Sequence, residues 1–497
     1  MFPRWLLALA VFSLTGSVYA ETANIIDRPA VASNLKLLEA WLQSEIDYRD
    51  QPGFVVGIVL DQDLIYAKGF GYADIEKKRP MTTDTLFRIG SQSKTFTAIA
   101  VLQLLEQGKL SLDDPVKEHL PNFSVAGDEV ASEEITIFHL LTHTAGLLSE
   151  GTQTTHWSDC EFPTWAHIDE QLKSVTIVFP PETKRKYSNL GYVLAGRIVE
   201  AVSGESFGDY VTRHILTPLG MDSTFVEFPE SCRERLATGY GRRMPEGTRE
   251  VIPHWDAKGM TAACGMSSTV TDMAKYVAWQ NRSIDGKEQD LLSPRTWRKA
   301  RHAHWVDPEW DKGWGLGYEV VHQGDRELIG HGGHMPGFFT STYIDAKQKL
   351  GVIVLTNSMD AQPYLGNPRS IPERIFQWVG GAIAQPDTGK EKPTPVEWQR
   401  FEGTYRCIWC DVRVMVLDGQ LVMVDPNEPN PKEALSTLEP IAGRPGQFRV
   451  GKTSDAQSYG ESVVFEMEPG GRTAKSVMVG SARLERVASA WNKPAAN

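Results

Sequence analysis

The sequence has little cysteine, no long apolar run after its first twenty residues and no excess of positive charge, and each shortage excludes a class of protein. Five cysteines in 497 residues are too few for a disulfide scaffold. No later apolar stretch approaches the roughly 20 residues that a membrane-spanning helix needs. A formal net charge of -12 argues against nucleic acid and against an anionic membrane as partners. We therefore predict no nucleic-acid partner and no membrane span.

The histidines and cysteines match no recognised metal motif. H-E-x-x-H does not occur, and a His-x-His pair is followed by an acidic residue, Asp307, one position too late for a zinc hydrolase. Cys407 and Cys410 form a single C-x-x-C, which favours a local disulfide or two free thiols over a metal site. Cys160 and Cys232 are the candidates for a further disulfide. We predict neither a metal nor a cofactor.

The first residues are typical of a secretory signal. Arg4 precedes a short apolar run, 5–12, and the segment ends on small residues at Ala20. We predict cleavage after Ala20, a signal peptide over 1–20 and a periplasmic or secreted product.

The pattern of strands and helices predicts an α+β fold. One helix is expected over 34–48, and two β-hairpins are expected over 54–70 and 339–355, near opposite ends of the same region. Helical patterns occupy most of the chain between the hairpins. We predict an antiparallel sheet in which the N- and C-terminal strands meet, flanked by helices and carrying an inserted helical lobe, all within a hydrolase domain over 21–384.

A second, smaller domain is predicted after a polar, proline-containing linker at 385–395. Asp418 and Gly419 lie between two alternating apolar runs, which is the strongest short hairpin signal in the chain. Further strand patterns follow it. Residues 396–490 are therefore predicted to form a small all-β barrel or sandwich.

The most informative motif is the S-x-x-K that begins at Ser91. A helix predicted from about Lys94 to Leu105 follows Gly90, so the serine hydroxyl and the lysine amine lie one turn apart on the same face. A serine becomes nucleophilic when a neighbouring base takes its proton, and a lysine whose pKa is lowered by burial can be that base. Alone, the tetrapeptide is more often a capped helix that carries a solvated lysine.

Two further segments, far apart along the chain, favour the catalytic interpretation. One contains Tyr187, whose phenol can relay a proton, and Asn189, whose amide can hold a substrate carbonyl. The other contains the sequence H-G-G from His331 to Gly333. Together with S-x-x-K, this triple resembles the superfamily of serine β-lactamases and penicillin-recognising enzymes. The resemblance is to its class C-like branch (peptidase family S12), which includes D-aminopeptidases, DD-carboxypeptidases and esterases.

The resemblance extends from about Ile46 to Asn357, and it implies roles for particular residues. It makes Ser91 the nucleophile, Lys94 its base or proton partner, and Tyr187 the group that shares the proton and protonates the leaving group. How the proton is divided between the lysine and the tyrosine stays open at this point.

The resemblance also implies substrate-binding roles for four residues: Asn189, His331, Gly333 and His334. It places the backbone N–H groups of Ser91 and His334 in an oxyanion hole. The family most often has Lys-Thr-Gly at the third motif, where this chain has H-G-G. Because histidine is largely neutral near pH 7, the exchange disfavours binding of β-lactams and of a free C-terminal carboxylate.

Other motifs have simpler interpretations. The G-x-S-x-G at 204–208 matches the nucleophile elbow of α/β-hydrolases, but that elbow needs a preceding strand, and 192–202 has helical spacing. His139 and His143, four residues apart on a predicted helix, are expected to be satisfied structural histidines. His331 and His334 lack a third ligand at a defined spacing and are expected to line the cleft rather than bind zinc.

These observations predict an exported serine hydrolase that forms an acyl-enzyme at Ser91. An S12-type peptidase or amidase acting on short peptides, including peptides with D-residues, is the first hypothesis. A carboxylesterase for small acyl esters is the alternative, and a β-lactamase is a weaker one. An inactive peptidoglycan-binding homologue is the non-enzyme alternative, against which the intact Ser91, Lys94 and Tyr187 argue. The expected partner is a small-molecule or short-peptide substrate, and the oligomeric state stays open.

Overall fold

The computed structural model describes residues 25–150, 155–286, 290–387, 393–454 and 457–487. The predicted signal peptide lies outside these residues. The chain divides into two compact units, one formed by Arg49–Glu373 and the other by Met1–Tyr48 together with Arg374–Asn497. The domain limits predicted from the sequence, at 384 and 396, concern which segments fold independently. They remain predictions. Among the described residues, no helix combines the length and the apolar character needed to cross a bilayer.

The larger unit is built on an antiparallel sheet, with nine strands in the described residues. The order across the sheet is β3 (Arg79–Pro80), β2 (Asp63–Asp74), β1 (Gly53–Leu60), β13 (Leu350–Thr356), β12 (Phe338–Asp345), β11 (Arg326–Met335), β10 (Glu319–Gln323), β9 (Lys312–Trp314) and β8 (Trp305–Val306). β1 pairs with β13, with Ile58 opposite Val352, so the two predicted hairpins meet at the centre of the sheet. This confirms the predicted fold class and the pairing of its terminal strands.

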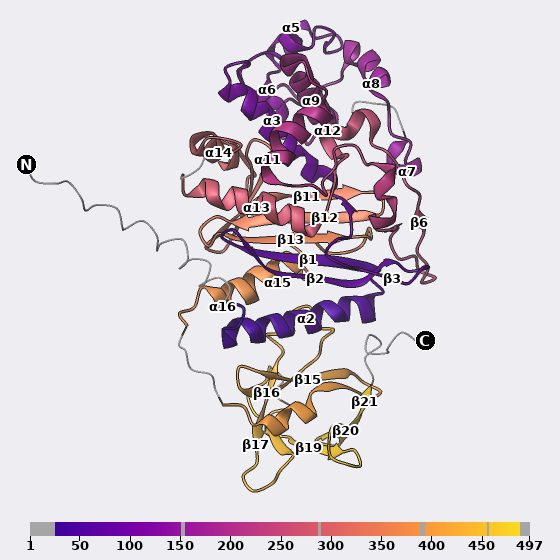
Figure 1. The fold of residues 1–497 in the computed structure, drawn as a ribbon, viewed down its shortest axis with the longest axis vertical. Helices are drawn as coiled ribbons and strands as arrows, with labels where there is room; N and C mark the ends of the chain where they lie inside the picture. The colour runs from indigo at the N-terminus through magenta and orange to yellow at the C-terminus, as the bar shows by residue number, and fades with distance from the viewer. Residues whose placement is uncertain (1–24, 151–154, 287–289, 388–392, 455–456, 488–497) are drawn as a thin grey trace, which may run out of the picture. The chain divides into compact units, whose positions relative to one another are not determined.

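The segment of chain between β3 and β8 is mostly helical and contains the inserted lobe (Figure 1). Its helices are α3 (Ser93–Glu106), α4 (Val116–His119), α5 (Glu129–Glu134), α6 (Ile137–Thr142), α7 (His156–Asp159), α8 (Trp165–Gln171), α9 (Asn189–Ser203), α10 (Phe207–Val211), α11 (Thr217–Leu219), α12 (Thr261–Cys264), α13 (Val270–Ile284) and α14 (Pro294–Arg301). α13 packs on β1 and β13, whereas α3 packs on α9 and α12. Because α3 is apolar and buried on all sides, it forms the centre of this lobe.

The smaller unit contains a closed β-barrel. Its strands are β14 (Gly403–Arg406), β15 (Asp411–Leu417), β16 (Gln420–Val424), β17 (Ser436–Pro440), β18 (Gln447–Val450), β19 (Ser462–Met467), β20 (Ala474–Val479) and β21 (Ala482–Val487). The turn between β15 and β16 has Asp418 at φ 45° and Gly419 at φ 72°, as a tight hairpin requires. Helix α2 (Pro29–Arg49) belongs to this unit, because the Ser44 hydroxyl donates to the Pro426 carbonyl and the Trp41 indole donates to the Glu428 carbonyl.

The predicted disulfide between Cys160 and Cys232 is wrong. All five cysteines are free thiols. Cys160 ends α7, and Cys232 lies in a 3₁₀ turn, Glu230–Arg235. A disulfide needs the two Cα atoms to lie within about 7 Å of each other. Spacing along the sequence does not reveal that distance. For Cys407 and Cys410 the structure has the second predicted alternative, two free thiols with their sulfur atoms 3.9 Å apart.

Candidate active site

Ser91 lies in η1 (Gly90–Gln92), the 3₁₀ turn that leads into α3. Gly90 has φ +56°, a left-handed conformation that glycine adopts without steric cost. The Ser93 hydroxyl donates to the Gly90 carbonyl at 2.7 Å and closes the turn. Ser91 is partly exposed although the helix after it is buried. The turn therefore presents the serine hydroxyl to solvent at the end of a rigid element.

Lys94 is fully buried one turn further on, and its ammonium nitrogen has three oxygen partners. Nζ lies 3.0 Å from Ser91 Oγ, 2.7 Å from Asn189 Oδ1 and 2.8 Å from the Ala263 carbonyl oxygen. The amide and carbonyl oxygens can only accept hydrogen bonds. A neutral amine has two hydrogens and one lone pair, so it satisfies both of these acceptors and turns its lone pair toward the serine hydroxyl.

The surroundings of Lys94 make this neutral form easier to reach than it is for an exposed lysine. Burial lowers the pKa of Lys94 to about 8, and the nearby Cys264 and Glu150 oppose part of that shift. An ordinary lysine side chain titrates near 10.4. A measurable fraction of Lys94 is therefore neutral near pH 7, with its lone pair directed at the group that it would deprotonate.

Tyr187 lies over the same pair of residues. Its ring centroid is 5.0 Å from Lys94 Nζ, and its ring packs on the His143 imidazole with centroids 4.2 Å apart. Burial raises the pKa of Tyr187, although a hydrogen bond with the Ser91 side chain opposes the shift. The phenol therefore keeps its proton at neutral pH and is suited to give one away rather than to act as a phenolate base.

The helix cap of α9 places Tyr187 and Asn189 on either side of Ser188. The Ser188 hydroxyl accepts a hydrogen bond from the Gly191 N–H at 3.0 Å, which caps the helix. The Ser188 N–H donates to His143 Nδ1 at 3.1 Å. One short segment thus brings a phenol to Ser91 and an amide to Lys94, and the sequence-predicted Ser91, Lys94, Tyr187 and Asn189 lie together.

Glu150 is a member of this cluster that the sequence did not reveal. Its Oε1 accepts hydrogen bonds from Asn189 Nδ2 at 2.8 Å and from the Ser149 hydroxyl at 2.9 Å, and its Oε2 lies 3.3 Å from His156 Nε2. Burial alone would raise the pKa of Glu150, but hydrogen bonds from His156, Ser149 and Asn189 hold it below its ordinary value. Glu150 is therefore ionised, and it fixes the amide of Asn189. No spacing pattern marks this residue in the sequence.

The third motif lies on β11, which runs beside η1. A Cβ atom added to Gly333 would lie 2.0 Å from the Ile89 carbonyl oxygen, so only glycine allows this close approach. The Tyr364 hydroxyl, which the sequence did not indicate, donates to the Gly333 carbonyl at 2.6 Å. A Cβ on Gly90 would lie 3.0 Å from the His334 amide nitrogen. β11 is thus held against the turn that carries Ser91, and the His334 N–H lies where the strand and the turn meet.

The two histidines of this motif are uncharged near pH 7. Burial lowers the pKa of His331 to about 3, and Lys94 adds to that shift. Burial also lowers the pKa of His334, whose ring stacks on Tyr364 at 4.3 Å. His331 packs edge-on to Trp314, with ring centroids 5.6 Å apart. The motif therefore offers neutral imidazoles, as the sequence predicted.

His143 differs from its prediction. It lies just after α6, in a left-handed conformation at φ 60°, and not on the helix with His139. Its Nδ1 accepts from Ser188, so the proton is on Nε2, and that buried atom has no partner in the described residues. A helix can place two histidines four residues apart on one face, but this helix ends one residue too early. His143 is a support for Tyr187 rather than a satisfied structural histidine.

Two other motifs lie away from this cluster. Ser206 of G-x-S-x-G follows helix α9 and caps α10, accepting from the Asp209 N–H, so the elbow interpretation is excluded. Asp114, Glu118 and His119, on and just before α4, lie close enough to share an ion, and His119 Nε2 is 3.0 Å from Asp114 Oδ2. These three residues come from elements that contribute nothing around Ser91.

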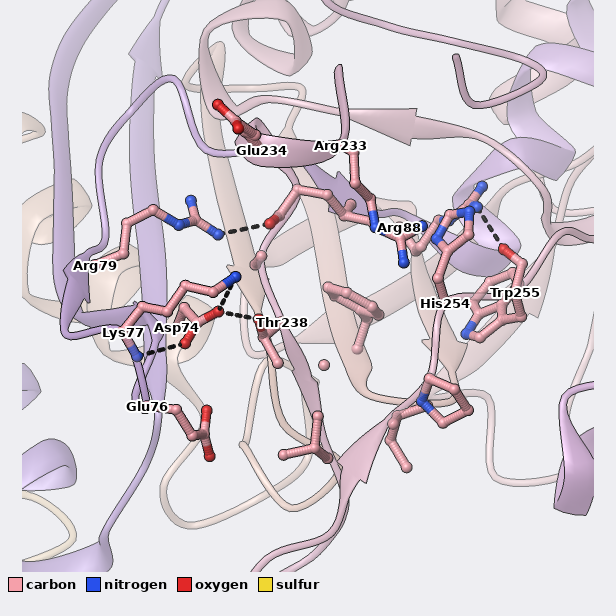
Figure 2. A pocket seen from close by; sticks show the side chains of 17 residues that line it. Asp74, Glu76, Lys77, Arg79, Arg88, Arg233, Glu234, Thr238, His254 and Trp255 are labelled. Carbon is pink, nitrogen blue, oxygen red and sulfur yellow. Dashed lines mark hydrogen bonds and ion pairs between the residues drawn. The ribbon is translucent and has the colours of Figure 1, made fainter. Parts of the chain in front are cut away.

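A separate pocket of about 750 Å³ has Arg88, three residues before Ser91 in the chain, in its wall (Figure 2). Four cationic side chains and three carboxylates line it, so their charges nearly cancel. The buried Arg88 guanidinium donates to the carbonyls of Trp255 and Gly265, and Arg79 donates to that of Leu236. Lys77 lies 3.5 Å from Asp74. The wall of this pocket thus carries charges of both signs.

Comparison with known proteins agrees with this site. The model of the family described as Beta-lactamase matches residues 38–373. Penicillin-binding protein 4* of Bacillus subtilis is 28% identical over 343 residues, 63% of this chain and 72% of that protein. Penicillin-binding protein 4 of Amycolatopsis lactamdurans is 28% identical over 372 residues, which are 71% of this chain and 93% of that protein.

Two solved structures have a similar fold. The octameric penicillin-binding protein homologue from Pyrococcus abyssi has a TM-score of 0.59 and 26% identity, and the match covers 90% of this chain and 99% of that one. EstCE1, a hydrolase with promiscuous acyltransferase activity, has a TM-score of 0.61 and 26% identity, and the match covers 70% of this chain and 99% of that one. The family model spans the whole arrangement of S-x-x-K, Tyr187 and H-G-G. The chain therefore belongs to the β-lactamase family and is a serine hydrolase of that fold.

Proposed function

We propose that the protein is an exported S12-type peptidase or amidase that cleaves short peptides, including those with D-residues, through an acyl-enzyme at Ser91. The observation that carries the chemistry is the hydrogen bonding of Lys94. Its two permanent acceptors leave the lone pair of the neutral amine facing the serine hydroxyl at 3.0 Å. Export rests on the sequence pattern at 1–20.

Acylation follows from this arrangement. Lys94 takes the proton from Ser91 Oγ as Oγ forms a bond to the scissile carbonyl carbon, and the N–H groups of Ser91 and His334 stabilise the resulting oxyanion. Tyr187 gives its proton to the leaving nitrogen as the carbon–nitrogen bond breaks, and it regains a proton from the Lys94 ammonium. Water then attacks the acyl-enzyme, with the same groups moving the proton in the opposite sense.

A carboxylesterase for small acyl esters is the second candidate. The neutral His331 favours it, because the cleft offers no lysine of a Lys-Thr-Gly motif to hold a substrate carboxylate. The similarity to EstCE1, which is described as a hydrolase with acyltransferase activity, points the same way. The same absence argues against the β-lactamase alternative.

A fluorophosphonate probe tests the nucleophile. We expect one probe per molecule by intact mass, on the peptide that contains Ser91, and no labelling of Ser91→Ala. Labelling that persists in Ser91→Ala would contradict the assignment of Ser91 as the nucleophile. An unlabelled wild-type protein would contradict the proposed hydrolase and favour the inactive binding homologue. Turnover of alanyl p-nitroanilides supports the peptidase, whereas turnover of p-nitrophenyl butyrate without any turnover of the anilides supports the esterase.

A further inference from the structure

The smaller unit carries a pair of thiols that the proposed hydrolase does not use. Cys407 and Cys410 belong to the turn between β14 and β15. All five cysteines of the chain are free thiols, and the sulfur atoms of these two lie 3.9 Å apart. A disulfide bond joins sulfur atoms about 2 Å apart. The two sulfur atoms therefore have to approach by about 2 Å, which rotation of the two side chains between staggered rotamers can supply.

The backbone holds the two cysteines opposite each other. Arg406 of β14 pairs with Asp411 of β15. Cys407 and Cys410 are therefore the next positions outward along the same two strands, and the Cys407 N–H donates to the Cys410 carbonyl at 3.0 Å. The Arg406 guanidinium binds both carboxylate oxygens of Asp411, at 2.7 and 2.6 Å, and fixes the base of the turn. Little conformational entropy is left to lose when a bond forms between the two thiols.

The turn is open to solvent. Cys410 is exposed and Cys407 is partly exposed. The two residues between them, Ile408 and Trp409, are 91% and 85% exposed. A buried structural thiol is inert, because no reagent reaches it. The sulfur atoms of this turn, in contrast, are accessible to a disulfide that approaches from solution.

The two thiols differ in how readily they ionise, and the thiolate is the form that attacks a disulfide. Burial alone would raise the pKa of Cys407, but hydrogen bonds from the Trp409 N–H, 3.4 Å from its sulfur, and from Cys410 hold it below its ordinary value. Burial and the neighbouring Cys407 raise the pKa of Cys410. The carboxylates of Asp425 and Asp411 add to this second shift. Cys407 is therefore the thiol suited to attack first.

We propose that Cys407 and Cys410 form a redox-active site that exchanges reversibly with disulfides in solution. The Cys407 thiolate attacks one sulfur of the disulfide, forms a mixed disulfide and releases the other sulfur as a thiolate. Cys410 then loses its proton and attacks the Cys407 sulfur, which closes the protein disulfide and releases the second thiolate. The protein dithiol loses two electrons and two protons, and the solution disulfide gains them and becomes two thiols. This chemistry is separate from the proposed acyl-enzyme at Ser91.

Peptide mapping measures the exchange on the full chain. The protein is reduced with dithiothreitol, freed of it, incubated in mixtures of oxidised and reduced glutathione, quenched in acid and alkylated in urea. Trypsin cleaves after Arg406 and Arg413, so a single peptide, 407–413, contains both cysteines. We expect this peptide to lose two hydrogens and take up no alkyl group when oxidised glutathione is in excess. Dithiothreitol should restore both thiols, and the oxidised fraction should follow the composition of the glutathione mixture.

Single substitutions separate the two roles. Cys410→Ser should stop at the mixed disulfide, with one glutathione on Cys407. Cys407→Ser leaves the less ionised thiol, which should react with oxidised glutathione about threefold to tenfold more slowly than Cys410→Ser does. Cys232→Ser removes a partly exposed cysteine of the larger unit and is the matched control. It should leave closure of the disulfide in peptide 407–413 unchanged.

Three results would overturn the inference. A wild-type peptide 407–413 that stays alkylated in oxidised glutathione, or that carries only glutathione, would mean that no bond closes between the two sulfur atoms. A disulfide that excess reduced glutathione does not open would be a structural bond rather than an exchange site. Zinc that copurifies with the protein and is lost in Cys407→Ser would assign the thiols to a metal. The wild-type measurement needs no variant to fold, and hydrolysis of anilides or esters does not enter it.

Discussion

The acid limb of the pH–rate profile is the sharpest consequence of the Lys94 environment. The amine acts as a base only when it is neutral, and its pKa is about 8. Activity in terms of kcat/KM should therefore rise with pH and level off above this value. At pH 7 about a tenth of the plateau remains, and at pH 6 about a hundredth. The shift from the ordinary lysine value corresponds to about 3 kcal/mol by which burial disfavours the charged amine.

The assay needs a substrate that does not itself titrate. Hydrolysis of p-nitrophenyl butyrate, followed at the isosbestic wavelength of its product and corrected for spontaneous hydrolysis, gives kcat/KM from pH 5.5 to 9.5. Lys94→Arg is the matched variant, because a guanidinium keeps its charge throughout this range. It should be at least a thousandfold less active at pH 8 and show no rise toward pH 9.5.

Two results would refute the reasoning. A profile that is flat from pH 9 to pH 6 would mean that the lysine does not act as the base. A midpoint near 6.5 would indicate a histidine of ordinary pKa, which His331 and His143 cannot supply because burial holds the pKa values of both far lower. A midpoint near 8 that persists in Lys94→Arg would assign the limb to another group.

Three further outcomes follow from the site. Tyr187→Phe should lower kcat/KM for an anilide by about 10² to 10⁴, and for a p-nitrophenyl ester by much less, because the ester's leaving group needs no proton. Gly333→Ala places a Cβ 2.0 Å from the Ile89 carbonyl and should reduce both activity and melting temperature, unlike Gly381→Ala, whose Cβ meets nothing within 4 Å. The buried Cys264, whose pKa is raised to about 12, should react with a thiol reagent in urea but not in the folded protein.

The sequence predicted the parts of the site whose signals are local. S-x-x-K specifies a serine and a lysine one helical turn apart, and a glycine before it allows the turn at φ +56°. The hairpins at 54–70 and 339–355 were readable because strand periodicity and turn residues act over a few positions. These features depend on neighbours in the chain, so a single sequence contains them.

Two predictions from the sequence are wrong because they depend on distances in space. Cys160 and Cys232 were paired without knowledge of the separation of their backbones. His143 was placed on a helix that ends at Thr142, and it supports Tyr187 through ring stacking and a bond to Ser188. Neither contact leaves a repeating pattern along the chain.

The sequence by itself determined which chemical groups are available: an alcohol, an amine, a phenol and neutral imidazoles in a defined order. The tertiary structure decided their states. Burial of Lys94 beside fixed acceptors lowers its pKa, and Asn189 connects Lys94 to the carboxylate of Glu150. Solvent exclusion and hydrogen-bond geometry depend on every element packed around a residue, and no short stretch of sequence contains that information.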